Sequence, residues 1–138
     1  MPMQLRRALV VIAACCLGAA GAGCGAGTNP DNGAFSAAYS DHRAAEVTVE
    51  GQVSVTLPDS PDRGDGIHQR FDVDIAGVRV EIDHNLSLAG RVPVTVGSSV
   101  IIHGQFEPDP GHPIIHYTHH ATGGHEGGWI DLGGTRYE

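Results

Sequence analysis

The sequence contains no Lys, and its eight Arg stand against 16 Asp and Glu, which gives a formal net charge of −8. Such a charge argues against a protein that binds nucleic acid by neutralising phosphates. A length of 138 residues also excludes a large two-lobed enzyme or a long repeat array. These absences leave one small acidic domain, in which nine His are the clearest excess.

Cysteine is absent from most of the chain, because Cys15, Cys16 and Cys24 are the only three. The residues after Cys24 cannot form disulfides or supply thiolate ligands. Any metal site there must therefore use His, Asp, Glu and backbone oxygens.

The sequence also lacks the motifs that would point to a reaction. It has no Gly-x-Ser-x-Gly nucleophile elbow, no phosphate loop, no dinucleotide-binding fingerprint and no His-Glu-x-x-His zinc motif. The residues alone therefore indicate neither a reaction nor a substrate.

Residues 1–23 have the pattern of a lipoprotein signal peptide. Arg6 and Arg7 precede an apolar run from Ala8 to Ala22, which is too short for a comfortable membrane span. The run ends at Gly21-Ala22-Gly23-Cys24, which resembles a bacterial lipobox. We therefore expect an exported cell-envelope protein, anchored to the membrane through a lipid on Cys24.

Two other processing sites fit the same N-terminus. Ordinary signal-peptidase cleavage after Ala22 would release a secreted protein, and a lipobox ending at Cys15 would leave an apolar region of about 7 residues. With residues 1–23 removed, six Arg remain against sixteen acidic residues, a net charge of −10. Residues 24–33 are small and polar, and we expect them to form a flexible tether.

The remaining residues, 34–138, have the alternating pattern of a single all-β domain. A short helix is expected over Ala34–Arg43, with Asn32 as its N-cap. Apolar and polar residues alternate from Val47 to Leu57, which predicts a half-buried strand. A loop rich in Asp, Pro and Gly follows over residues 59–66.

The clearest local signal is a hairpin formed by Arg70–Ile75 and Val78–Asp83, with a two-residue turn at Ala76-Gly77. Its inner face pairs apolar residues such as Phe71 with Ile82. On its outer face the pairs are Asp74 with Arg79, Arg70 with Asp83, and Asp72 with Glu81, which repel each other.

The second half of the domain supplies the remaining elements. They are a helical turn at Asn85–Gly90, strands at Val100–Phe106 and Ile114–His119, an extended segment at Val94–Val96, and a C-terminal hairpin of Trp129–Leu132 and Thr135–Tyr137. Three strands, a short helical link and two more strands are the order of an oligonucleotide/oligosaccharide-binding (OB) barrel. We therefore predict an OB-like β-barrel with five main strands, a short N-terminal helix and a C-terminal hairpin.

Six of the nine His lie between residues 103 and 125, which indicates a binding site near one strand end. The residues expected to hold a divalent transition metal such as Zn, or a small polar ligand, are His84, His116, His119 and His120. The candidate supporting residues are Asp83, Asn85, Gln69, Thr118 and Trp129. Trp129 also fits a core position that closes the barrel.

A straight strand would keep these His apart. His116 and His120 would share one face but lie about 13 Å apart, at ~3.3 Å per residue. A single ion therefore requires a bend near Thr118, or a ligand from a neighbouring strand such as His84. The hairpin register places His68 on the face opposite His84, unless the hairpin end curls.

Five motifs occur in order along the domain. They are His68-Gln69-x-Phe71, His84-Asn85-x-x-Leu88, Gly104-Gln105-Phe106-Glu107, Ile115-His116-x-Thr118-His119-His120 and Gly128-Trp129-Ile130. Together they resemble the small bacterial family catalogued as domain of unknown function 3465, over residues 34–138. The resemblance implies that His68 belongs to the same functional set as His84, His116, His119 and His120, but it implies no activity.

The chain departs from the family pattern in two places. Tyr117 stands where Trp is expected, which preserves an aromatic wall. Ala121-Thr122 stands where Asp-Pro is expected, which removes an acidic residue that could act as a metal ligand or support one.

Three functions fit the sequence. The first is a lipid-anchored domain that binds a metal ion or small polar ligand through the His set. The second is a metal-dependent hydrolase acting on phosphodiesters, with His68 or Asp65 as the base. The third is a structural envelope protein without a ligand. Nucleic acid is not expected as a partner, because the charge of the chain opposes it.

Overall fold

A computed structural model describes residues 29–138 of the chain. The expected signal peptide, Cys24 and the first part of the expected tether lie outside these residues. Among the residues that are described, no helix has both the length and the apolar character needed to cross a membrane.

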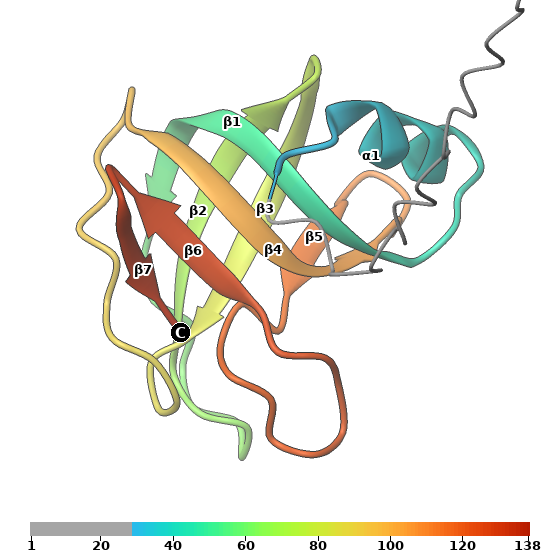
Figure 1. Ribbon diagram of the computed structural model, residues 1–138. Helices are drawn as coiled ribbons and strands as arrows, with labels where there is room; N and C mark the ends of the chain where they lie inside the picture. Colours follow the sequence, from blue (N-terminus) through green and yellow to red (C-terminus); the bar gives the residue numbers. More distant parts are fainter. Residues whose placement is uncertain (1–28) are drawn as a thin grey trace, which may run out of the picture.

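A closed barrel of five strands forms the body of the domain, as the sequence predicted. The strands are β1 (Ala45–Leu57), β2 (His68–Ile75), β3 (Val78–Asn85), β4 (Ser99–Glu107) and β5 (Ile114–His116). They pair in the order β1-β2-β3-β5-β4, and β1 also pairs with β4, which closes the barrel (Figure 1). All neighbours are antiparallel except β3 and β5, which run parallel. This is an OB-like barrel.

The length of β1 explains how the barrel closes. Its residues 45–52 pair with β4, and its residues 52–57 pair with β2. The register shifts between Val53 and Val55, and a bulge of this kind bends a strand and increases its twist. Val47, Val49 and Val53 are buried, as the alternation of the sequence predicted.

Helix α1 (Asn32–Ser40) covers one end of the barrel. Phe35 and Ala38 are fully buried, and the ring of Phe35 packs edge-on against Phe106 at 5.1 Å. The helix begins earlier than expected because Asp31, not Asn32, is the N-cap: its side chain accepts a hydrogen bond from the amide of Ala34. The helix therefore includes Asn32 and Gly33, which were expected in the tether.

The β2–β3 hairpin has the register that the sequence predicted. Ile75 pairs with Val78, Phe71 with Ile82, and Gln69 with His84. Phe71, Val73, Val80 and Ile82 are fully buried, and the opposite parity faces outward. This outward parity carries the charged residues of the hairpin.

The C-terminal hairpin is also confirmed. Strand β6 (Trp129–Leu132) pairs with β4 and with β7 (Thr135–Tyr137), and Asp131 lies opposite Arg136. The hairpin extends the sheet beyond β4, outside the closed barrel.

The turn expected at Asn85–Gly90 is present, with the amide of Ala89 bonded to the carbonyl of Asn85 at 3.0 Å, and Val94–Val96 belongs to no strand. One expected element differs in the structure. Strand β5 ends at His116 instead of His119, because Tyr117 has a φ of 55°. A left-handed residue cannot continue a strand, so the alternation expected from His116 to His120 is wrong.

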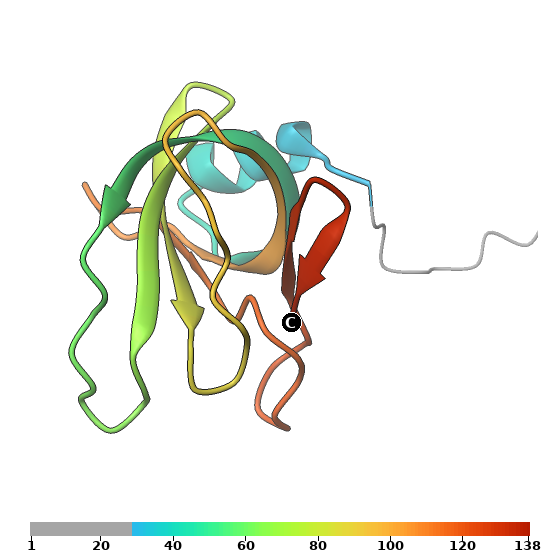
Figure 2. The same cartoon turned by 90° about the vertical axis from the view of Figure 1, so that its left-hand side faces the viewer.

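Three loops project from the end of the barrel opposite α1. Residues 58–67, 86–91 and 117–128 reach the same side in both views (Figures 1 and 2). Residues far apart in the sequence therefore meet at this end.

Candidate functional site

A polar cleft lies on the outer face of β2, β3 and β5, beside the loop 58–67. It consists of two adjoining hollows of about 360 and 190 Å³. Both are lined by Asp65, His68, Asp83 and His116. We call the two together the outer cleft, and the 190 Å³ part the smaller hollow.

The strand register brings these side chains together. Arg70 pairs with Asp83 across β2 and β3, and Ile82 pairs with Ile115 across β3 and β5. Asp83 and His116 each follow one of the paired isoleucines, which are fully buried. Because successive residues of a strand face opposite sides, Asp83 and His116 both face outward on adjacent strands.

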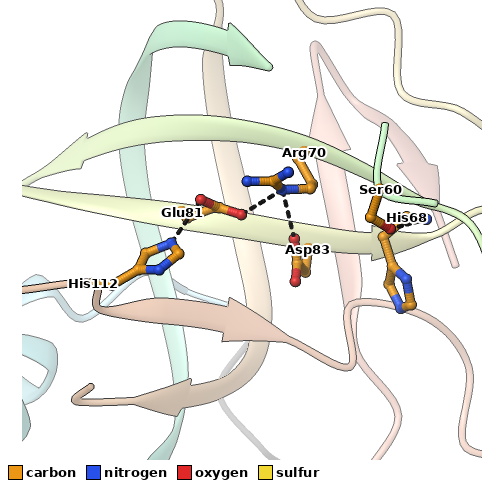
Figure 3. Close-up of polar contacts among 6 residues, drawn as sticks. All are labelled: Ser60, His68, Arg70, Glu81, Asp83 and His112. Carbon is orange, nitrogen blue, oxygen red and sulfur yellow. Dashed lines mark hydrogen bonds and ion pairs between the residues drawn. The ribbon is translucent and has the colours of Figure 1, made fainter. Parts of the chain in front are cut away.

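A charged network forms the wall of the larger hollow (Figure 3). The carboxylate of Glu81 accepts hydrogen bonds from Nε of Arg70 at 2.6 Å and from Nε2 of His112 at 2.7 Å. Burial alone would raise the pKa of Glu81, but these two hydrogen bonds lower it on balance. Arg70 thus lies closer to Glu81, at 2.6 Å, than to Asp83, at 3.8 Å. Its main partner is therefore Glu81 and not Asp83, the residue opposite it on β3.

Two buried atoms in the outer cleft have no hydrogen-bond partner among the described residues. They are Oδ1 of Asp83 and Nε2 of His116. Burial raises the pKa of the Asp83 carboxyl, and the nearby Glu81 raises it further. Burial lowers the pKa of His116, although Glu107, 3.8 Å from its Nε2, partly offsets this effect.

The turn after β5 places a third imidazole on the cleft. Because the chain turns at Tyr117, His119 lines the smaller hollow and is 4% exposed. Its Nδ1 donates a hydrogen bond to the carbonyl of His120 at 2.9 Å, and burial lowers its pKa. The ring of Tyr117 stacks between His116 and His125, with centroids at 3.9 and 4.2 Å.

His84 lies inside the barrel and not in the cleft. Its Nε2 donates to the carbonyl of Gly90 at 3.0 Å, so its Nδ1 accepts from the hydroxyl of Thr118 at 2.9 Å. Both residues are fully buried, and burial lowers the pKa of His84. The neutral ring has no lone pair left for a metal or ligand.

The other predicted residues have different surroundings. His120 is exposed and lines neither hollow. The side-chain amide of Gln69 bonds to both the N–H and the carbonyl of Val92, which attaches the segment before β4 to β2. Asn85 lines the smaller hollow, but its amide is bonded to the backbone of Asp65 and Ser87. These two side chains hold loops in place.

Trp129 lies away from the outer cleft. Its ring stacks on the ring of His103, with centroids 5.8 Å apart. The guanidinium of Arg136, on β7, lies 3.9 Å from the centroid of the Trp129 ring. Trp129 is 8% exposed and lines neither hollow. The ring is buried, but it belongs neither to the cleft nor to the hydrophobic cluster inside the barrel.

The structure therefore brings together His68, His116, His119, Asp83 and Asn85 from the expected set, and separates them from His84 and His120. It adds Arg70, Glu81 and His112, which the sequence reasoning did not select. The sequence pattern could have indicated Arg70 and Glu81, because both lie on the outward-facing side of the hairpin, next to Asp83. His112 follows a turn and shows no such pattern.

As the side chains stand, no three His, Cys, Asp or Glu of residues 29–138 converge closely enough to hold a metal ion. The bend that the sequence required near Thr118 exists at Tyr117. It moves His119 toward the cleft and leaves His120 outside.

Comparison with known proteins gives a family and nothing more specific. A family model described as "Protein of unknown function (DUF3465)" matches residues 22–138. No curated protein and no solved structure matches the chain.

Proposed function

We propose that this chain, which belongs to the DUF3465 family, is an exported, lipid-anchored domain that binds a small polar or ionic ligand in the outer cleft. The observation that carries the proposal is the pair of buried atoms without a hydrogen bond, Oδ1 of Asp83 and Nε2 of His116. Buried polar groups are nearly always hydrogen-bonded, and leaving one unpaired costs about 1–3 kcal/mol. A ligand that bonds to both atoms would remove this cost.

The position of the cleft supports the same proposal. OB barrels bind ligands on the face of their second and third strands and on the adjoining loops. The outer cleft occupies this face, and the loops 58–67 and 117–128 flank it. Asp65 and Asp83 favour a ligand that is cationic or donates hydrogen bonds, which is consistent with the acidic charge of the chain.

A ligand panel tests the cleft. The full-length protein, purified in detergent without a tag, is titrated with Zn²⁺, Ca²⁺, glucose and inorganic phosphate while amide chemical shifts are recorded. At least one probe should shift the amides of His68, Asp83 and His116. Asp83→Asn and His116→Gln should weaken that probe about 10-fold or more, the equivalent of one lost hydrogen bond to a charged group.

The exposed His120 provides the matched control. His120→Gln should leave the affinity of the active probe unchanged, because its side chain lines neither hollow. Shifts confined to another surface would contradict the cleft as the site. No response to any probe would favour a structural protein without a ligand.

The lipid anchor has a separate test. Cys24→Ala should abolish lipid attachment, and the protein should move from the detergent phase to the aqueous phase of a Triton X-114 extraction, with the mass change confirmed by mass spectrometry. Cys15→Ala should remain lipidated. Loss of the lipid only in the Cys15 variant would place the lipobox at the earlier site, and an unlipidated wild type would indicate ordinary cleavage.

A further inference from the structure

The smaller hollow is lined by side chains whose nitrogen and oxygen atoms can act as metal ligands. They are the imidazoles of His68, His116 and His119 and the carboxylates of Asp65 and Asp83, beside Asn85 and Tyr117. No Arg lines this hollow, and the chain has no Lys. The cation closest to the carboxylate of Asp83 is Arg70, whose Nε lies 3.8 Å from Oδ1.

Several of these donor atoms make no hydrogen bond within the described residues. Oδ1 of Asp83 and Nε2 of His116 are buried without a hydrogen bond, and each has one longer ionic contact at 3.8 Å, with Arg70 and Glu107 respectively. Within residues 29–138 the ring of His68 also makes no hydrogen bond, since only its backbone is bonded, its amide to the hydroxyl and its carbonyl to the amide of Ser60. Three side chains on three segments thus line one hollow, and each has a donor atom without a hydrogen bond.

The tautomer of His119 adds a fourth donor. A carbonyl oxygen can only accept, so the contact with His120 places the proton of His119 on Nδ1. Its Nε2 then carries a lone pair. Histidines that bind metals usually donate their other ring N–H to a carbonyl or carboxylate in this way, which fixes the orientation of the ring.

The chemistry of this set selects one class of ligand. Two carboxylates, of which Asp83 has the guanidinium of Arg70 at 3.8 Å, would together still repel phosphate or another anion. Ca²⁺ and Mg²⁺ prefer oxygen ligands only, whereas imidazole nitrogens combined with carboxylate suit Zn²⁺, Ni²⁺ and Cu²⁺. A divalent transition metal is therefore the ligand that uses the most of these atoms.

We propose that the smaller hollow binds one divalent transition-metal ion through Asp83, His116, His119 and His68; this inference rests on the proposed function of the outer cleft. Asp83 and His116 lie on adjacent strands and form the fixed part of the site. His119, from the loop after β5, completes it while keeping its hydrogen bond to His120, and His68, from the start of β2, joins it by side-chain rotation into the hollow. Asp65 lies beside them as a further carboxylate.

The experiment measures metal content and affinity. The tag-free full-length protein is stripped with a chelator and titrated calorimetrically with Zn²⁺, Ni²⁺, Mn²⁺ and Ca²⁺. One Zn²⁺ should bind per chain, more tightly than Ca²⁺. Asp83→Asn and His116→Gln should each lower the affinity at least about 100-fold, because even outer partners of metal ligands typically contribute 10–100-fold. The visible spectrum of the Co²⁺ form should lose intensity in the same variants.

Controls separate binding from folding. Asp83→Asn is nearly isosteric, and Oδ1 of Asp83 has no hydrogen bond to lose and only a 3.8 Å contact with Arg70, so the metal-free variant should melt close to the wild type. His120→Gln should bind Zn²⁺ within about twofold of the wild type, as a surface change of little energetic effect. Unchanged affinity in both cleft variants, or loss of binding in His120→Gln alone, would overturn the assignment.

The outcome also distinguishes this inference from the function on which it rests. If glucose or phosphate shifts the cleft amides while no metal binds, the metal inference is wrong and the ligand-binding cleft stands. If neither the metals nor the other probes affect the cleft, both are wrong.

Discussion

Gly128→Ala is expected to destabilise the protein by about 3 kcal/mol or more, at the upper end of overpacking effects. A Cβ on residue 128 would lie 2.1 Å from the carbonyl oxygen of Tyr117 and 2.5 Å from that of His103. Both are backbone atoms and cannot rotate aside. The chain must move either strand β4 or the turn at Tyr117 to accept one methyl group.

Gly124→Ala is the matched control for this change. It lies in the same loop, and a Cβ there would meet no atom within 4 Å. Its free energy of unfolding should change by no more than about 0.5 kcal/mol. Urea unfolding followed by the fluorescence of Trp129, the only Trp in the chain, measures both variants. Equal stability of the two would show that the close approach at Gly128 is relaxed in solution.

The same close approach shapes the candidate site. A Cβ on Gly104 would lie 2.5 Å from the carbonyl oxygen of His116. In the same way, a Cβ on Gly128 would approach the carbonyl oxygen of Tyr117. Two glycines therefore allow β5 and the following turn to press against β4 and the segment before β6. Without this approach, His116 and His119 could not line one hollow.

The fold could be predicted in detail where local rules decide the structure. The β2–β3 register follows from the Ala76-Gly77 turn and from the period of two in the flanking strands. The same rule assigned Asp83 and His84 to opposite faces, which the structure confirms. Strand length was less predictable, since the end of β5 depends on one left-handed residue, Tyr117, and not on hydrophobic pattern.

The candidate site could be predicted only in part. His density directed attention to the segment around residue 116, where His116 and His119 line the cleft, but density does not show which ring nitrogens are already bonded. Both ring nitrogens of His84 are hydrogen-bonded, one to the carbonyl of Gly90 and one to the hydroxyl of Thr118. These contacts depend on where two loops return to the barrel, which the sequence does not show. His112 reaches Glu81 from a loop across 31 residues of sequence, and no local pattern indicates such a contact.

His84→Gln is expected to destabilise the protein by about 1–3 kcal/mol at pH 7.5, as one or two buried hydrogen bonds are weakened. Glutamine can donate to the carbonyl of Gly90 and accept from Thr118, but without the fixed geometry of the imidazole. The folded protein keeps His84 neutral, because burial lowers its pKa below the ordinary value of 6.5.

The pH dependence distinguishes the titration of His84 from its packing. Below pH 6.5 the unfolded chain binds a proton at residue 84 that the folded chain does not accept. The stabilising contribution of the neutral ring is thus complete above pH 6.5 and is lost as the pH falls toward the lowered pKa of the folded state. The cost of His84→Gln should accordingly shrink by up to about 1.4 kcal/mol between pH 7.5 and pH 5.5.

Thr118→Val is the variant that tests this interpretation. It removes the hydroxyl that donates to Nδ1 of His84 but leaves the imidazole in place, so it should cost about 1–3 kcal/mol. Its dependence on pH should stay close to that of the wild type, because the group that titrates is still present. Both variants and the wild type are unfolded in urea with chelator at each pH, so that metal does not contribute. A difference between His84→Gln and wild type that stays constant with pH would mean that His84 is protonated as readily in the barrel as in the unfolded chain. The barrel interior around residue 84 would then be hydrated, and the loop that supplies Gly90 would have to open in solution.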